Sequence, residues 1–173
     1  MTKKNAHFRL VALLAMALAW LIPGAGHLCV GRPVRAAIIF LTIGATFWAG
    51  MAMGGVMTVD SRNERWWYIA EMFTGVHGLA AWRLSEKVTS RLAAEANIPL
   101  SNPGGLDFGQ QVIMDQKYDQ AGLALVSPTD TIARAYAGVA GLMNLMCIFD
   151  ALMLGMMGLR GEPRPAAAKE TKP

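Results

Sequence analysis

An uncharged segment of 24 residues, from Ala36 to Val59, constrains this chain more than any other feature. A helix of about 20 predominantly apolar residues is long enough to cross the hydrocarbon core of a bilayer. The composition agrees, because 54% of the residues are hydrophobic and only 16% are charged, whereas roughly 25% are charged in ordinary soluble domains. The segment is therefore predicted to be a transmembrane helix, with its span at about residues 36–58.

Two further segments have the character of membrane spans. Residues 8–23 contain the unbroken apolar run from Leu10 to Ile22. Residues 132–157 carry a single charge after Ala135, at Asp150. Both segments are predicted to be helices that cross the membrane.

A fourth span is predicted at residues 66–83. It begins with Trp66-Trp67-Tyr68, and aromatic residues of this kind gather at the membrane–water interface. The segment is less apolar than the others, because it contains Glu71 and His77. A helix that lies in the interface is therefore the alternative to a span.

Together the segments predict an all-α fold, a polytopic transmembrane helical bundle of three or four helices in a single membrane domain, residues 1–160. An irregular extramembrane loop is expected over residues 84–130. The helix predicted at residues 66–83 is expected to continue into this region to about Asn97. A short hairpin is expected around Val112–Tyr118. The Pro-, Ala- and Lys-rich tail, residues 161–173, is predicted to be disordered.

The first 26 residues allow two interpretations. The apolar run behind Lys3, Lys4 and Arg9 has the length of a signal-peptide core. No small-x-small cleavage site follows it, and the uncharged stretch continues to Val30. These features favour a retained membrane helix, and a signal peptide is the alternative.

A tight hairpin is predicted between the first two spans, over residues 23–35. Pro23 lacks a backbone N–H and ends a helix, and the glycines that follow permit a reversal. The hairpin would place His27, Arg32 and Arg35 at the level of the lipid headgroups, where basic groups suit an anionic phosphate. The alternative is a turn histidine beside ordinary flanking arginines.

Small residues recur every four positions along the second span, at Thr42, Thr46, Gly50 and Gly54. Small side chains let membrane helices approach closely, since lipid provides no hydrophobic drive for their association. This face is predicted to pack against another helix of the chain, a second copy, or another membrane protein.

Four polar residues fall within the predicted spans: Glu71, His77, Asn144 and Asp150. Ionisable residues at membrane depth are costly and usually face the bundle interior. Glu71 and His77 lie about 120° apart on a helix, so they are not expected to share a face. Asn144 is expected to form a hydrogen bond between helices. For the three ionisable residues, a functional role and a position near the interface both stay open.

The sequence contains no motif that predicts catalysis or nucleotide binding. Cys29 and Cys147 lack the CxxC spacing of a zinc site or a redox pair. The basic residues are scattered, although the net charge is +4, which argues against a nucleic-acid partner. We therefore predict no catalytic residue, no metal and no cofactor, with the lipid bilayer as the expected partner.

Two stretches resemble a known group of proteins. Ile22-Pro23-Gly24-Ala25-Gly26-His27-Leu28-Cys29-Val30-Gly31-Arg32 resembles the Pro-Gly-x-Gly-His turn of the two-transmembrane-helix domain family, with Cys29 where an aromatic residue is usual. Residues 140–151, Ala-Gly-Leu-Met-Asn-Leu-Met-Cys-Ile-Phe-Asp-Ala, resemble the C-terminal signature of an uncharacterised bacterial family of small multi-pass membrane proteins. The resemblance implies a membrane location and a helix hairpin, and it implies no established activity.

These patterns predict a non-enzymatic structural, accessory or assembly component of a bacterial cytoplasmic (inner) membrane. A small oligomeric transporter or channel is the alternative. If there are four spans, nine Lys and Arg residues lie on the side of the two termini and seven on the other side. The positive-inside rule then favours cytoplasmic termini.

Overall fold

The fold was analysed in a computed structural model, which describes residues 3–62, 64–100, 106–123 and 129–162. These residues form seven α-helices, one short 3₁₀ helix and no strand, which confirms the all-α prediction for this part of the chain. In chain order the elements are α1 (Lys3–Leu21), α2 (Ala25–Cys29), α3 (Pro33–Gly54), the 3₁₀ helix η1 (Gly55–Thr58), α4 (Arg65–Met72), α5 (Val76–Glu95), α6 (Phe108–Gln120) and α7 (Thr129–Met157).

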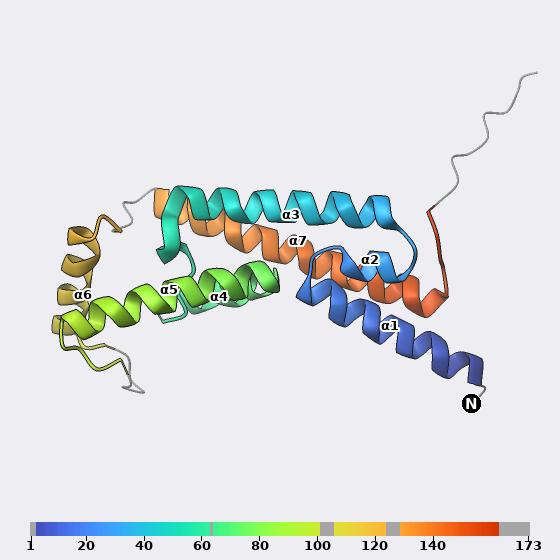
Figure 1. Ribbon diagram of the computed structural model, residues 1–173, viewed down its shortest axis with the longest axis horizontal. Helices are drawn as coiled ribbons and strands as arrows, with labels where there is room; N and C mark the ends of the chain where they lie inside the picture. Colours follow the sequence, from blue (N-terminus) through green and yellow to red (C-terminus); the bar gives the residue numbers. More distant parts are fainter. Residues whose placement is uncertain (1–2, 63, 101–105, 124–128, 163–173) are drawn as a thin grey trace, which may run out of the picture.

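The antiparallel helices α3 and α7 form the long axis of the molecule (Figure 1). The stretches Pro33–Thr58 and Thr129–Met157 are long and apolar enough to cross a membrane, judged by length and composition. They coincide with two of the four predicted spans. The apolar part of α1, Leu10–Leu21, is shorter.

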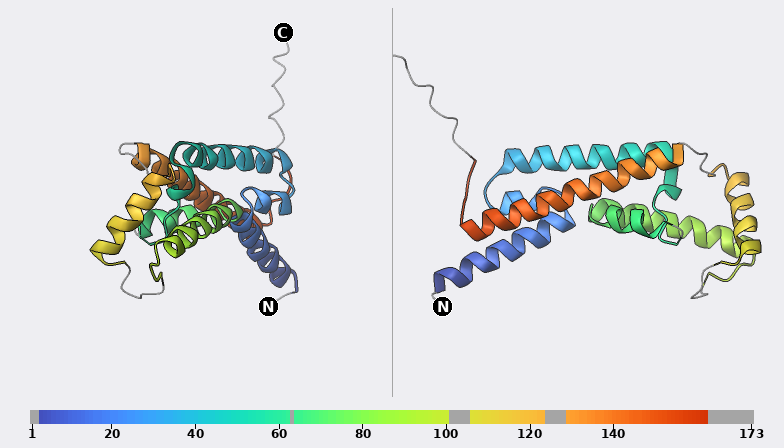
Figure 2. Two further views of the ribbon diagram at one scale, coloured as in Figure 1. Left: turned by 60° about the vertical axis from the view of Figure 1, so that its left-hand side comes forward. Right: turned by 180° about the vertical axis from the view of Figure 1, so that it is seen from behind.

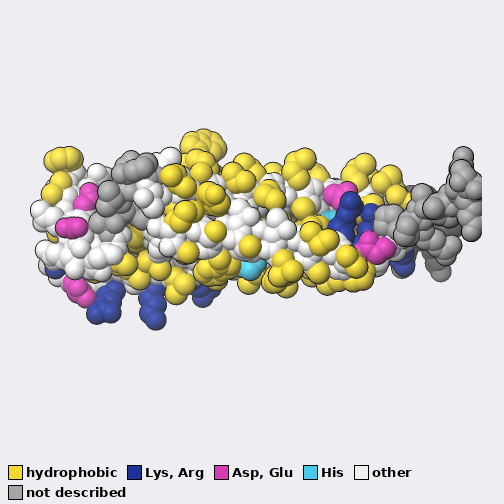
Figure 3. All heavy atoms as spheres, turned by 90° about the horizontal axis from the view of Figure 1, so that it is seen from above, with side chains coloured by type: hydrophobic (Ala, Val, Ile, Leu, Met, Phe, Trp, Pro, Cys, Tyr) yellow, Lys and Arg dark blue, Asp and Glu magenta, His cyan; other side chains and the backbone are white. Residues whose placement is uncertain are grey.

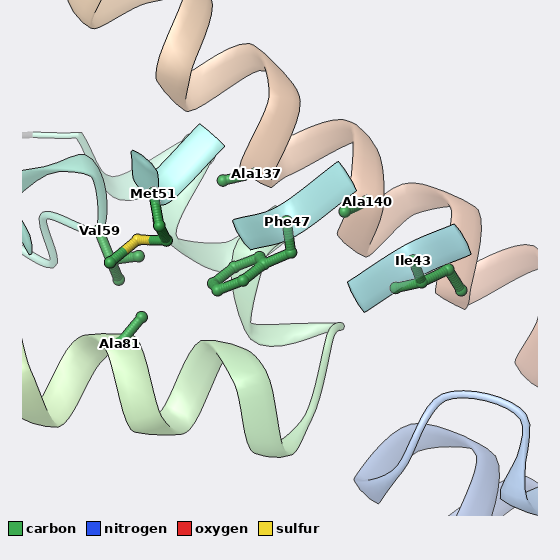
Figure 4. Close-up of a cluster of buried hydrophobic side chains, with 7 residues drawn as sticks. All are labelled: Ile43, Phe47, Met51, Val59, Ala81, Ala137 and Ala140. Atoms are coloured by element: carbon green, nitrogen blue, oxygen red, sulfur yellow. The ribbon is translucent and has the colours of Figure 1, made fainter. Parts of the chain in front are cut away.

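A cluster of buried apolar side chains joins α3 to α7 (Figure 4). Phe47 and Ile43 of α3 lie against Ala137 and Ala140 of α7, and Ala81 of α5 closes the cluster from the other side. Gly50 lies so close to the backbone of α7 that an added Cβ would come within 2.6 Å of the Ala133 carbonyl oxygen. Small residues therefore bring the two long helices together.

The predicted small-residue face of α3 is only partly buried. Gly50 and Gly54 are buried, whereas Thr42 is exposed and Thr46 half-buried. The hydroxyl of Thr46 donates to the backbone carbonyl of Thr42 at 2.8 Å, inside the same helix. Because the residues that face α7 also include Ile43 and Phe47, the contact follows a stripe shifted from the predicted one.

Helix α1 packs on the second half of α7 through small side chains. Ala12, Ala15 and Ala19 are buried, and the last two form a cluster with Ile148 and Ala151 of α7. The leucines on the other side of α1 are exposed. The burial of one narrow alanine face brings α1 close to α7 and leaves its large side chains outward.

The chain reverses after α1, and α2 folds back against it. Gly24 has φ 85° and its position lies against the carbonyl oxygen of Ala36 in α3, so a side chain fits neither the backbone conformation nor the space. Gly26 likewise lies against Ala15 and Ala19. The reversal begins at Pro23 as predicted, but its second arm is the short helix α2 and not the next long helix.

The segment predicted as a single span at residues 66–83 is interrupted, which corrects that prediction. Helix α4 ends at Met72, and α5 begins at Val76 after a turn in which Gly75 has φ 62°. The two helices form a hairpin that approaches the end of α1 from the opposite end of the molecule (Figures 1 and 2). A Cβ at Gly75 would overlap the carbonyl oxygens of Trp20 and Leu21.

The region predicted as an irregular loop, residues 84–130, is largely helical where it is described. Helix α5 continues to Glu95, close to the predicted stop at Asn97. Residues 108–120 form α6, so the hairpin predicted around Val112–Tyr118 is wrong. Tyr118 donates to Thr89 of α5 at 3.1 Å, and burial raises the pKa of this phenol above its ordinary value. The tail predicted as disordered lies outside the described residues from residue 163 onward.

Candidate functional site

Asn144 of α7 holds the ends of two helices that approach from opposite directions. Its side-chain amide donates to the carbonyl oxygen of Ala19 at 3.0 Å and to that of Phe73 at 2.8 Å. The last carbonyls of a helix have no partner within it, so one side chain satisfies a free acceptor of α1 and another at the end of α4. We call these three residues the central node.

The central node lies halfway along α7. At 1.5 Å per residue, Asn144 is about 22 Å from the beginning of α7 and about 20 Å from its end. Asn144 is fully buried. Helix α4 can approach α7 this closely because residue 141 is a glycine. A Cβ at Gly141 would overlap the carbonyl oxygen of Ala70 in α4.

Glu71 is buried beside the central node without a partner for its charge. Its side chain has no exposed surface, and within the described part of the chain neither carboxylate oxygen has a hydrogen-bond partner. Its backbone carbonyl accepts the Thr74 hydroxyl at 2.6 Å, which stabilises the turn before Gly75. A buried carboxylate without a partner is costly, so packing alone does not explain a glutamate at this position.

His77 lies at the start of α5 among aromatic rings of α3. Its ring centre is 5.7 Å from that of Phe40, 6.1 Å from that of Phe47 and 6.3 Å from that of Trp48. The indole N–H of Trp48 donates to Nδ1 of His77 at 3.2 Å. No hydrogen bond joins His77 to Glu71 among the described residues. The two residues lie on different helices, α5 and α4, so the predicted separation around one continuous helix does not apply.

A second polar group, the end cluster, lies where α2, α3 and α7 meet. His27 Nε2 lies 2.9 Å from Asp150 Oδ2, and Nη1 of Arg35 donates to the same oxygen at 3.1 Å. His27 is fully buried, whereas the side chains of Arg35 and Asp150 are 48% and 47% exposed. The cluster thus joins a buried imidazole to an ion pair at the surface.

The segment after α7 closes the end cluster. The backbone carbonyl of Gly161 accepts Nε of Arg32 at 3.1 Å, and its N–H donates to the carbonyl of Val30 at 2.9 Å. Glu162 Oε1 accepts the backbone N–H groups of Val34 and Arg35 at 3.2 and 3.3 Å. A carboxylate at this position caps the free N–H groups at the beginning of α3.

An open groove of about 500 Å³ runs beside the end cluster. Its charged lining consists of Arg35, Asp150 and Glu162, and its apolar lining consists of Val34, Ile38, Ile39 and Cys147. The charged groups lie toward the beginning of α3. In Figure 3, acidic and basic side chains gather in a compact group within an otherwise apolar surface near this end.

The fold brings together residues that the sequence suggested separately. Asp150, a candidate from the last predicted span, lies with His27 and Arg35 from the glycine-rich turn, and Arg32 lies next to them. Glu71 and His77 lie elsewhere, at the tip of the α4–α5 hairpin. Asn144 forms the interhelical hydrogen bonds described above.

Some residues at these sites were missed in the sequence. The alanines of α1 recur at positions 12, 15 and 19, a helical spacing that is visible in the sequence. Glu162 was assigned to a disordered tail. Gly75 falls inside the span predicted at residues 66–83, because an isolated glycine within a helical pattern is often tolerated. Among the described residues, no three His, Cys, Asp or Glu side chains gather as a metal site would require.

Comparison with known proteins identifies a family without a known activity. No curated protein and no solved structure matches the chain. The family model that does match spans residues 14–163 and is described as a family of unknown function. The expected membership in an uncharacterised family is confirmed, and the expected relation to the two-transmembrane-helix domain stays a prediction. The groove, the central node and the α4–α5 hairpin all fall within the matched residues, as does the second half of α1. The chain belongs to the family of unknown function DUF6677.

Proposed function

We propose that this protein is an integral component of the bacterial cytoplasmic membrane with a non-enzymatic accessory or assembly role. The observation that carries the membrane location is the apolar surface of the long helices, which Figure 3 shows on one face, with charged side chains toward both ends. Large exposed apolar side chains lie on every long helix: Leu10, Leu13 and Leu14 on α1, Ile38, Phe40 and Leu41 on α3, and Leu142, Met146, Phe149 and Met153 on α7. A water-soluble surface rarely exposes so much apolar area.

In this proposal α3 and α7 cross the bilayer, and two hairpins enter it from opposite faces. The α1–α2 hairpin turns back near the central node, and so does the α4–α5 hairpin. Non-helical backbone at membrane depth is tolerated where protein covers it, and Asn144 supplies that cover. The dependence of the central node on α1 favours a retained helix over a signal peptide.

Two crossings place both termini on one side of the membrane. Nine basic residues accompany the termini: Lys3, Lys4, Arg9, Arg32, Arg35, Arg160, Arg164, Lys169 and Lys172. Seven lie on the other side: Arg62, Arg65, Arg83, Lys87, Arg91, Lys117 and Arg134. In the arrangement with four spans, Arg32 and Arg35 lie opposite the termini, and Arg62 and Arg65 lie on the side of the termini. With two crossings these two pairs exchange sides. The number of basic residues on each side is therefore the same, and the positive-inside rule again favours cytoplasmic termini.

The accessory role is supported by a second small-residue stripe, which stays uncovered on α3. Thr42, Ala45, Ala49 and Ala52 are exposed, although small residues in membrane helices usually allow another helix to approach. A single cysteine at Ala49, in a variant that lacks Cys29 and Cys147, should cross-link to a neighbouring protein or a second copy in native membranes. A cysteine at Met153 on α7 is the matched control. Equal absence of cross-links at both positions would argue against the role.

Cysteine accessibility tests the membrane location. Ile22 and Val76 lie near the hairpin tips and are 41% and 43% exposed in the isolated chain. In a membrane, single cysteines at these positions should resist a water-soluble maleimide until detergent is added. Cysteines at Ser90 and Gln111, exposed at the end that carries α6, should react without detergent. Rapid labelling at Ile22 and Val76 in intact membranes would refute the location.

A second function, passage of protons or cations by an oligomer, is favoured by Glu71. A buried carboxylate at membrane depth marks ion pathways in many membrane proteins. If Glu71 serves this role, liposomes that contain the protein should show a flux that Glu71→Gln abolishes. Glu64→Gln is the control, because Glu64 pairs with Arg134 at the end of the helices. Flux that is the same in both variants, or absent from the unaltered protein, would exclude it.

A further inference from the structure

We propose that the groove beside the end cluster binds an aminophospholipid, whose phosphate lies on Arg35 and whose primary ammonium lies between Asp150 and Glu162. The inference deepens the proposed function and rests on its membrane location. It assigns a ligand class to a groove of about 500 Å³ that has both apolar and charged walls.

The lining of the groove suits a lipid, because one part of it is charged and can contact a headgroup and the other part is apolar and can contact an acyl chain. Val34 and Ile38 are 62% and 60% exposed, and together with Ile39 and Cys147 they form its apolar lining. Arg35 lies in the first turn of α3, and Asp150 is about 10 Å from the end of α7. The charged part thus lies near the ends of both crossings, where headgroups lie, and the apolar part continues along α3 toward the middle.

The charged groups retain free hydrogen-bonding capacity. Within the described residues, the two bonds to Asp150 both reach Oδ2, and the two bonds to Glu162 both reach Oε1. Each carboxylate therefore has a second oxygen that can accept from a ligand. Arg35 uses only Nη1 on Asp150, and the remaining N–H groups of its guanidinium can donate to a phosphate.

The balance of charge selects among headgroups. One guanidinium and two carboxylates line the groove, so a headgroup with only negative charge would meet two carboxylates of the same sign. A choline headgroup carries a positive charge but no N–H, and cannot donate to the free carboxylate oxygens. A primary ammonium joined to a phosphate matches both kinds of partner, as in phosphatidylethanolamine.

Native mass spectrometry on the full-length purified protein tests the assignment. Delipidated protein in detergent is offered phosphatidylethanolamine, phosphatidylcholine and phosphatidylglycerol with identical acyl chains, one at a time. We expect phosphatidylethanolamine to bind roughly tenfold more tightly than either of the others, the scale of one charge-assisted hydrogen bond. Equal binding of phosphatidylglycerol or phosphatidylcholine would overturn the proposal.

Variants locate the binding to this groove. Two groove variants, Asp150→Asn and Glu162→Gln, should each abolish the preference for phosphatidylethanolamine, because they neutralise the carboxylates that the ammonium would contact. Arg35→Gln should instead weaken the binding of all three lipids alike, because all three carry the phosphate. Glu95→Gln is the matched control, because it breaks an Arg–carboxylate pair at 3.1 Å on α5, far from the groove, and should leave the preference unchanged. Loss of the preference in the control, or its survival in both groove variants, would overturn the assignment.

Ile38→Trp guards against a loss of binding that merely reflects misfolding. Ile38 lines the groove but is 60% exposed, so a larger side chain should block the acyl chain without disturbing the core. Lipid binding should fall while the melting temperature in lipid-free detergent stays the same; undiminished binding would contradict the site. A protein that resists labelling at the hairpin tips but shows no headgroup preference would refute the lipid site alone.

Discussion

The two hairpins resemble each other in outline and differ in what holds them. Each reverses at a glycine with positive φ, Gly24 or Gly75, and each places a histidine shortly afterward, His27 or His77. His27 reaches the charged group Asp150 near the end of α7. His77 lies among aromatic rings, and the one carboxylate near its turn, Glu71, has no partner among the described residues.

The difference shows two ways to stabilise a turn within a helical bundle. The α1–α2 hairpin returns to an end of the molecule where charges are half-exposed and can pair. The α4–α5 hairpin is held by close backbone contact and by the turn bond between Thr74 and Glu71. Charge removal should therefore weaken the first hairpin and leave the second intact, whereas loss of a tip glycine should affect both.

The largest effect is expected from added bulk at the tips. Gly75→Ala should destabilise the protein by on the order of 4 kcal/mol, because a positive φ and overlap with α1 act together. Gly55→Ala is the control: its φ of 65° and ψ of −162° also favour glycine, but nothing lies within 4 Å, so only the backbone cost of about 1–3 kcal/mol remains. Unfolding by SDS in mixed micelles, followed by circular dichroism, measures both. Equal losses would mean that the tip does not contact α1.

Removal of the central node should weaken both hairpins together. Asn144→Ala leaves the carbonyls of Ala19 and Phe73 without a donor, which should cost about 2 kcal/mol. Hydrogen exchange should rise at the end of α1 and at the α4–α5 turn to a similar extent. Thr46→Val, which removes a bond within one helix, should change neither. Faster exchange in only one hairpin would show that Asn144 does not join them.

Neutralisation of Asp150 should have a smaller effect, confined to the α1–α2 hairpin. Because the Arg35–Asp150 pair is about half exposed, Asp150→Asn should cost only about 0.5–1 kcal/mol. Glu95→Gln removes a more exposed pair within one helix and should cost less. Chemical denaturation in detergent compares the two. A loss above about 2 kcal/mol would indicate a charge pair far more buried than this geometry allows.

Neutralisation of Glu71 should have the smallest effect on stability, and of opposite sign. Glu71→Gln preserves shape and removes a carboxylate without a partner, so we expect no loss and a gain of up to about 1 kcal/mol. Glu64→Gln is the comparison, because it breaks a pair with Arg134, which is only 14% exposed. If Glu71→Gln lowers stability more than Glu64→Gln, the α4–α5 hairpin depends on charge after all.

The long helices could be predicted from the sequence because their signal is local. The uncharged runs of α3 and α7 fix their positions regardless of the rest of the fold. Helix α6 also had a local signal, the capping box in which Asp107 and Gln110 bond each other's backbone, although the mixed polar composition obscured it.

The hairpins and the end cluster could not be predicted in the same way. Gly75, in the turn between α4 and α5, lies against the end of α1, and that contact joins residues more than fifty positions apart. The pairing of Arg35 with Asp150 depends on the register between α3 and α7. Both the position of the α4–α5 turn and the Arg35–Asp150 pairing are determined by tertiary contacts. The sequence pattern within one segment does not contain that information.

Helix α7 has a consequence for the order of synthesis. The helices α1, α3 and α4 all pack against it, yet all three precede it in the chain and leave the ribosome earlier. Until Asn144 arrives, the ends of α1 and α4 lack their shared donor, and the buried faces of the earlier helices lack their common surface. The nascent chain must therefore hold these three helices without their common partner until α7 has been synthesised.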